Sequence, residues 1–146
     1  MRRLWIVAAT VVACAGLAGQ TSVAHAESAD THAATSCSDL INKYKNINRA
    51  EANVLGQGNP SNVRKYYSNL AKTLNKLASS GPSELHTAFK HLAQYIAKVA
   101  KIDFSNPSAI QQAAPQLVGA ARQLQPDVQK IAAYFGTVCH YTPPTT

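Results

Sequence analysis

The chain has 146 residues, of which 14 are Lys or Arg and 7 are Asp or Glu, and its formal net charge at pH 7 is +7. A chain of this length forms one ordinary domain, with a core large enough to fold alone and no room for a second. The basic residues are spread along the predicted helices and the chain begins with an export signal, so nucleic acid is not an expected partner.

The first 26 residues contain the three parts of an export signal. Met1-Arg2-Arg3 supplies the positive charge, residues 4–18 form the apolar run, and Ala24-His25-Ala26 is a small-x-small cleavage site. The sequence therefore predicts a signal peptide over residues 1–26 and a secreted or cell-envelope protein. Cleavage after Ala26 leaves 12 basic and 7 acidic residues, a net charge of +5.

A second interpretation of this segment stays open. Val11-Val12-Ala13-Cys14 resembles a bacterial lipobox, in which the cysteine is lipidated after cleavage and becomes the first mature residue. The stretch before Cys14 would then be very short, and the apolar run continues beyond it to Ala18. Cleavage after Ala26 is therefore the favoured prediction.

The mature chain divides into three parts. Residues 27–36 are small and polar without apolar periodicity, and we expect them to form a flexible leader. The helical domain is predicted over residues 37–139. Residues 140–146 contain Pro143-Pro144 and are expected to form a disordered tail.

Three helices are predicted in the first part of this domain. The first begins near Ser36 or Ser38, either of which can accept a hydrogen bond from a free amide, and ends at Leu55. The second begins at Asn59-Pro60-Ser61, and its apolar residues are spaced four and three apart: Val63, Tyr67, Leu70, Leu74 and Leu77. The third begins at Pro82-Ser83, ends near Lys101 and repeats this spacing: Leu85, Phe89, Leu92, Ile96 and Val99.

The last predicted helix begins at Ser105-Asn106-Pro107 and runs to Val138. Its apolar residues keep the same spacing across Pro115 and Pro126. An interior proline removes a backbone hydrogen bond and clashes with the preceding turn. Because the phase is preserved, we expect kinks within one long helix, with a break at Pro115 as the next choice.

Four amphipathic helices with short connections predict an all-α fold, an up-down-up-down four-helix bundle whose last helix is long and kinked. Two cysteines remain after the signal, Cys37 and Cys139. In an oxidising compartment such a pair is expected to form a disulfide. The bundle places the start of the first helix and the end of the fourth at the same end, so the two predictions agree.

Histidine and tyrosine residues are the candidate ligand contacts. An exported helical protein can hold haem iron with such side chains, which makes Tyr67, His86 and His91 the residues to consider. His86 and His91 are five residues apart and point to different faces of a helix, and no Cys-x-x-Cys pair is present. Surface histidines and a core tyrosine are the simpler interpretation, so we predict no metal and no cofactor.

Four basic residues lie on the second helix away from its apolar seam: Arg64, Lys65, Lys72 and Lys76. Such a patch attracts anionic lipids or polymers. A charged stretch is more often simply a solvated helix face. The patch is therefore a hypothesis about a surface that binds an anionic envelope component or an envelope protein.

Enzymatic chemistry finds little support in the sequence. No Ser or Cys stands beside a His in a nucleophile motif, and no glycine-rich phosphate loop is present. Glu51 lies on the seam of the first helix, where it is either a rim residue paired with a Lys or a catalytic carboxylate with a raised pKa. The rim interpretation is favoured, so we predict no catalytic residue and no enzyme.

Three short stretches carry a resemblance: a Cys after a polar leader, Pro82-Ser83-Glu84-Leu85-His86 before Leu92-Ala93-Gln94-Tyr95, and Ile131-Ala132-Ala133-Tyr134 leading to Cys139. The chain resembles small actinobacterial secreted or lipoprotein helical bundles with two cysteines, a resemblance that implies no activity. More distantly it is similar to mycobacterial haemophore-like proteins. Those carry a His-Pro turn near the end of the first helix, where this chain reads Gly56-Gln57-Gly58-Asn59-Pro60, and this departure argues against haem.

Export, a disulfide and the lack of catalytic motifs favour a non-enzymatic binding or interaction module in the cell envelope or outside the cell. The alternative is an exported carrier of haem or another hydrophobic small ligand.

Overall fold

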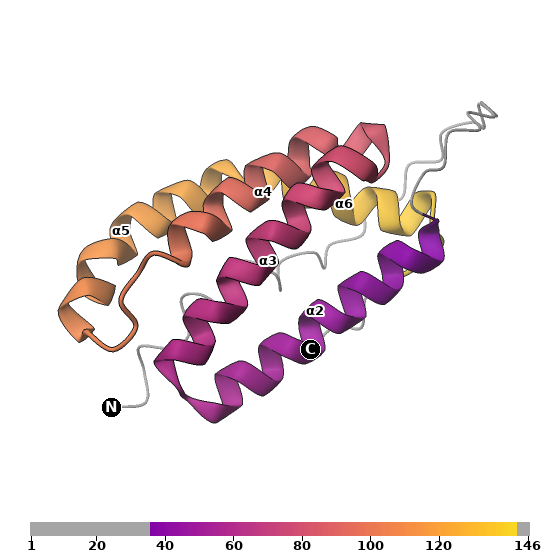
Figure 1. Ribbon diagram of the computed structural model, residues 1–146. Coiled ribbons are helices and arrows are strands. Elements are labelled where there is room, and N and C mark those ends of the chain that lie inside the picture. The colour runs from indigo at the N-terminus through magenta and orange to yellow at the C-terminus, as the bar shows by residue number, and fades with distance from the viewer. Residues whose placement is uncertain (1–35, 143–146) are drawn as a thin grey trace.

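Short polar side chains begin the main helices of the computed structural model, which describes residues 36–142 (Figure 1). Ser36 Oγ accepts a hydrogen bond from the backbone N–H of Asp39 and begins α2 (Cys37–Gln57). Asn59 and Asn106 cap α3 (Pro60–Ser80) and α5 (Pro107–Gln123) in the same way. Each asparagine is followed by a proline, which suits the first turn because that turn lacks partners for its N–H groups.

The remaining elements are a 3-10 turn, η1 (Ser83–Leu85), and two helices, α4 (His86–Val99) and α6 (Gln125–Thr137). The part of the chain that the structure describes is thus all-helical, as predicted. The signal peptide, Cys14 and most of the leader lie outside the described residues.

Two glycines define helix ends. Gly58 has the left-handed conformation, with φ +62°, and its N–H donates to the Leu55 carbonyl oxygen. α2 therefore runs two residues beyond the predicted end at Leu55. Gly81 ends α3, and its N–H donates to the Leu77 carbonyl oxygen at 2.9 Å.

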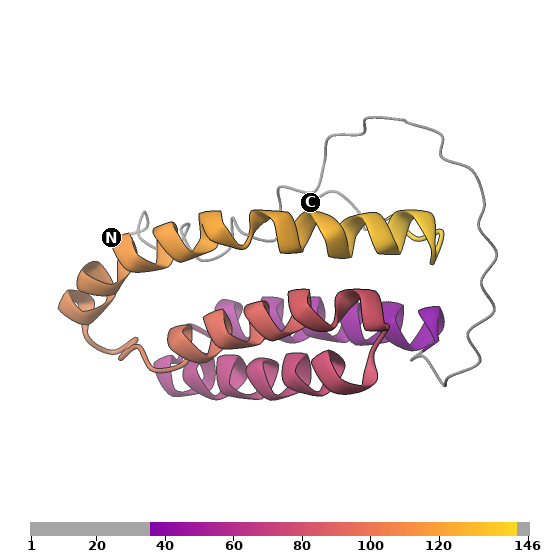
Figure 2. The same cartoon turned by 90° about the horizontal axis from the view of Figure 1, so that it is seen from above.

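α3 and α4 form the most extensive helix pair and run antiparallel (Figure 1). Figure 2 shows α5 and α6 following one another on one side of the molecule, with α2, α3 and α4 on the other. In the described residues no helix is long and apolar enough to cross a membrane.

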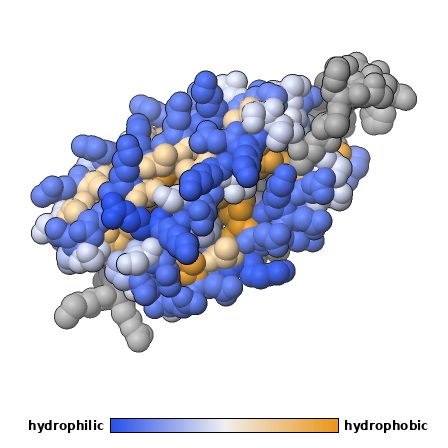
Figure 3. All heavy atoms as spheres, viewed as in Figure 1, coloured by the Kyte–Doolittle hydropathy of each residue, from blue (hydrophilic) through white to orange (hydrophobic). Residues whose placement is uncertain are grey.

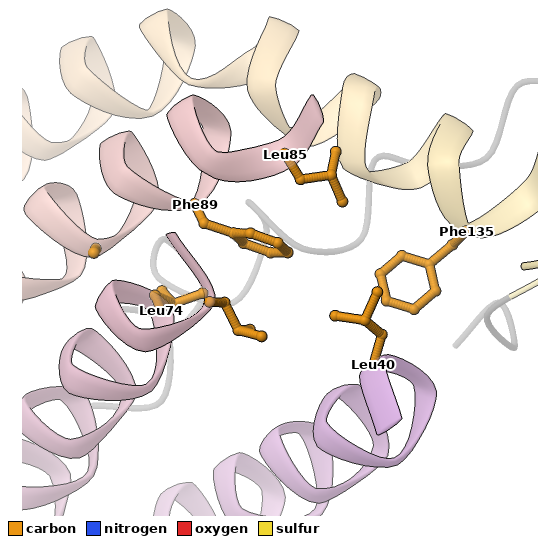
Figure 4. Packing of buried hydrophobic residues seen from close by; sticks show 7 residues of the cluster. Leu40, Leu74, Leu85, Phe89 and Phe135 are labelled. Atoms are coloured by element: carbon orange, nitrogen blue, oxygen red, sulfur yellow. The ribbon is translucent and has the colours of Figure 1, made fainter. Parts of the chain in front are cut away.

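Two groups of buried side chains hold the helices together. Near the cysteines, Leu40 from α2 and Phe135 from α6 point toward Leu74, Leu85 and Phe89 (Figure 4). At the other end of α3, a second group is formed by the buried residues Val63, Tyr67, Val99 and Ala100. The seams of the second and third helices do face the core, because these groups include members of both predicted apolar stripes: Val63, Tyr67, Leu74, Leu85, Phe89 and Val99. Ala100 lies outside the stripes.

The predicted long last helix is two helices. α5 continues through Pro115, and the regular helix is interrupted at Leu124, a turn residue with φ −84° and ψ −8°, before α6 begins. Pro126 explains this position, because a proline has no N–H and its ring clashes with the preceding turn. Neither effect matters in the first turn of a new helix, where the N–H groups have no partner within the helix and no turn of the same helix precedes. Pro126 is the second residue of α6.

A disulfide joins Cys37, the first residue of α2, to Cys139, just after α6, with a Cα–Cα distance of 5.2 Å. This confirms the predicted pairing across 102 residues. Tyr141 lies beyond it, in the segment expected to be a disordered tail. Its N–H nevertheless donates to the Phe135 carbonyl oxygen, and its ring packs against Tyr44. Ordered packing therefore extends past residue 140.

Candidate functional site

A groove of about 460 Å³ runs between α3 and the end of α4. From α3 its lining residues are Arg64, Ser68, Ala71, Lys72 and Asn75. From α4 and the turn that follows they are Ala97, Ala100 and Lys101. Figure 3 shows apolar surface along α4 on this face, with strongly hydrophilic side chains beside it over α3.

The helical repeat explains why these residues share one side of α3. Arg64, Ser68, Ala71 and Asn75 follow one another at intervals of four, three and four, so their side chains form one row. Tyr67 and the apolar seam occupy another side of the helix and face the core. The packing of the apolar seam of α3 against the core therefore also holds the groove residues of α3 in position.

Small side chains form the floor of the groove. Ala71 and Ala100 are buried, and Ala97 is partly buried. Alanine side chains let two helices pack closely and leave space above the contact that larger side chains would fill. The polar rim consequently stands above an apolar floor.

Arg64 is held at one end of the groove. Its Nε donates to the carbonyl oxygen of Ala100 at 3.3 Å. This oxygen lies at the carboxyl end of α4, where the helix dipole favours a positive charge. The bond uses the Nε–H of Arg64 and leaves its terminal N–H groups for other partners, on a groove that Lys101 also lines.

No carboxylate in residues 36–142 forms an ion pair with the cations of the groove, and Asp103 interacts with Arg64 only at longer range: hydrogen bonds from Ser105 and, to a smaller extent, the Arg64 charge lower the Asp103 pKa. The sequence of α3 contains no Asp or Glu. Among residues 36–142 the one ion pair joins His91 Nδ1 to Asp127 Oδ2 at 2.8 Å, away from the groove. Arg64, Lys72 and Lys101 are therefore not neutralised by a carboxylate within 4.0 Å, and the groove has a positive local potential.

The predicted basic patch divides into two parts. Arg64 and Lys72 line the groove, whereas Lys65 and Lys76 are exposed on α3 outside its lining. Lys101 was missed by the sequence analysis, because it stands beyond the third helix. The predicted antiparallel packing of the second and third helices could have indicated its position, because this packing brings the end of the third helix beside the start of the second.

The three candidate ligand contacts are not brought together. His86 Nε2 donates to the Gly81 carbonyl oxygen at 2.8 Å, and His91 pairs with Asp127 on α6. Tyr67 is buried in the second core group, 14 residues before Gly81 in the chain. At a rise of 1.5 Å per residue, it is about 20 Å from His86 along α3.

Glu51 on α2 is half-buried and lies close enough to Tyr66 and Tyr67 for its charge to act on both. Burial raises its pKa, and no described Lys or Arg forms an ion pair with it. Burial, and secondly the Glu51 charge, raise the pKa of Tyr67 to about 12 and raise that of Tyr66 as well. The Tyr66 hydroxyl donates to the Ile47 carbonyl oxygen at 3.3 Å. Both tyrosine hydroxyls therefore stay protonated at neutral pH, and we expect no proton transfer between them and the Glu51 carboxylate.

Within the described residues, no three His, Cys, Asp or Glu side chains are grouped so that they could hold a metal ion. The groove between α3 and α4 combines basic side chains with a floor of small apolar ones and is the candidate site considered below. No family model, curated protein or solved structure matches the chain.

Proposed function

We propose that this protein is a non-enzymatic binding module of the cell envelope or the extracellular space, and that it binds an anionic partner through the groove between α3 and α4. One observation carries the proposal. Arg64, Lys72 and Lys101 surround an alanine floor, and no carboxylate of the described residues pairs with them. An anion entering the groove would therefore meet Lys72 and Lys101 without a carboxylate partner, and Arg64 with only the longer-range charge of Asp103 beside it.

The helix pair that forms the groove supports a rigid site. α3 and α4 have the most extensive contact in the structure, and the Arg64–Ala100 hydrogen bond ties their ends together. A groove that is already shaped loses little conformational freedom when it binds its partner.

The export pattern of residues 1–26 supports the location, and the disulfide is compatible with an oxidising compartment. We favour cleavage after Ala26 over lipidation of Cys14. An intact mass that begins at Glu27 is the expected result, whereas a lipid-modified Cys14 would contradict it.

We also propose that α5 and α6 together form the fourth arm of an up-down-up-down bundle. Their course along one side of the molecule supports this arrangement (Figure 2), as does the disulfide between the first and last helices.

Retention of the mature protein on immobilised dextran sulfate tests the function. We expect the Lys72→Glu/Lys101→Glu variant to elute at a much lower salt concentration than the wild type. Lys45→Glu/Lys130→Glu changes the net charge equally at two exposed positions outside the groove, and we expect a small shift. Equal elution of the two double variants would contradict the groove as the binding site.

A further inference from the structure

We infer that the groove takes an extended acidic segment of a partner protein, with the peptide main chain on the alanine floor and two carboxylates on the flanking cations. The inference rests on the proposed function and specifies its partner. Four features of the groove favour a peptide.

The first feature is the distance between the charges. Arg64 and Lys72 are eight residues apart on α3, which corresponds to about 12 Å along the helix axis. An extended chain advances about 3.3 Å per residue, and every second side chain lies on the same face. Two acidic residues four positions apart in an extended peptide are thus separated by about 13 Å and face the same way.

The second feature is the chemistry between the cations. Ser68 and Asn75 lie in the lining, and their side chains both donate and accept hydrogen bonds. A peptide backbone offers N–H and C=O groups that match this pair. A phosphate or sulfate polymer offers acceptors alone, and it would place further negative charges against the apolar floor of Ala71 and Ala97.

The third feature is the surroundings of the groove. In the described residues the large apolar side chains classed as exposed are Val118 and Val138, and neither belongs to α3 or α4. A surface that binds a membrane normally adds apolar side chains that enter the lipid interface. The groove has cations around a concave floor, which suits a narrow chain better than a flat bilayer.

The fourth feature is the preset orientation of Arg64. Its Nε is already bonded to the Ala100 carbonyl oxygen, which orients the planar group, while its terminal N–H groups point to no carboxylate within ion-pair distance in residues 36–142 and meet the Asp103 charge only at longer range. An arginine in this state can donate two parallel hydrogen bonds to a carboxylate. A lysine at the same position would keep the charge and lose this geometry.

Fluorescence anisotropy with two peptides of the same composition tests the inference on the mature protein. The spaced peptide is Gly-Glu-Ala-Ser-Ala-Glu-Gly, and the control Gly-Ala-Glu-Glu-Ser-Ala-Gly has adjacent acids; both carry the same neutral dye. We expect the spaced peptide to bind the wild type about tenfold more tightly, because charged hydrogen bonds contribute at both ends.

The Arg64→Lys variant separates recognition from simple attraction. It should weaken binding of the spaced peptide about tenfold, by loss of the bidentate geometry, while retention on dextran sulfate stays near that of the wild type. Lys130→Arg is the matched control at an exposed position of α6 and should change neither measurement.

The outcomes distinguish the two proposals. Equal binding of the two peptides, or no effect of Arg64→Lys, would overturn the peptide inference. Tighter binding of polyphosphate of equal charge, or of phosphatidylglycerol vesicles, would also overturn it and leave an anion-binding module. Failure to bind peptides, polyphosphate, vesicles and dextran sulfate alike would overturn the proposed function as well.

Discussion

Arg64 and Ala100 are 36 residues apart in the chain, and a hydrogen bond from the arginine Nε to the alanine carbonyl oxygen joins the first turns of α3 to the end of α4. The bond closes one end of the groove and satisfies a carbonyl group at a helix terminus, where such groups lack a partner within the helix. The same side chain therefore contributes to stability and to the charge of the site.

Replacing Arg64 by Ala should lower the free energy of unfolding by about 1 kcal/mol, the usual net contribution of one hydrogen bond. Urea denaturation followed by circular dichroism measures the change. Lys65→Ala is the control, because Lys65 is exposed and adjacent in the chain, and such a surface change should stay within about 0.5 kcal/mol. An equal decrease in the free energy of unfolding of the two variants would show that the Arg64–Ala100 hydrogen bond does not contribute to stability.

The disulfide should contribute a large part of the stability. It closes a loop with a sequence separation of 102 residues, and removal of a native disulfide from a small exported domain typically costs about 2–5 kcal/mol. We expect Cys37→Ala/Cys139→Ala to lower the urea midpoint strongly, and reduction of the wild type to give the same midpoint. An unchanged midpoint in both cases would show that the buried groups around Leu40 and Phe135 suffice to hold α2.

Glu51 gives the stability a pH dependence of defined sign. Burial raises its pKa in the folded state, so the folded protein holds this proton more tightly than the unfolded chain does. The contribution to stability is therefore fully present below the unfolded pKa and is lost as the pH rises through the folded pKa. At neutral pH the ionised Glu51 carboxylate is a net cost.

The variant Glu51→Gln should consequently melt higher than the wild type at pH 7, and the difference should shrink as the pH falls toward the ordinary range of a Glu carboxyl. Thermal melting from pH 4 to pH 8 measures this difference, with Glu84→Gln as the control at an exposed position of η1. A wild type that melts higher than Glu51→Gln at pH 7 would reveal a favourable partner for the carboxylate.

Local signals were sufficient for the starts of α2, α3 and α5, but the third helix was expected from Pro82-Ser83, where the structure has η1 before α4, and the start of α6 was not predicted. Asn59 and Asn106 act within their own turns, so the sequence predicts them. The division between α5 and α6 could not be predicted, because two consecutive helices can keep the same spacing of apolar residues. Leu124 fits that spacing and is buried, although it lies at the junction of the two helices. Lys101 was hidden for a different reason, since its place in the groove depends on which helix lies beside α4.

Two glycines, one at a helix end and one inside a helix, provide an opposed pair of predictions about stability. A Cβ at Gly81 would lie 2.5 Å from the Leu77 carbonyl oxygen, whereas a Cβ at Gly119, inside α5, would meet nothing within 4 Å. The Leu77 oxygen belongs to the backbone and already accepts the Gly81 N–H, so it cannot move aside without loss of that bond. Gly81→Ala should therefore destabilise the fold by about 1–3 kcal/mol. Gly119→Ala should stabilise it by up to about 1 kcal/mol, because alanine is the better helix former. Thermal melting of the two variants tests the pair, and a stabilised Gly81→Ala would show that the chain after α3 can shift without disturbing the start of α4.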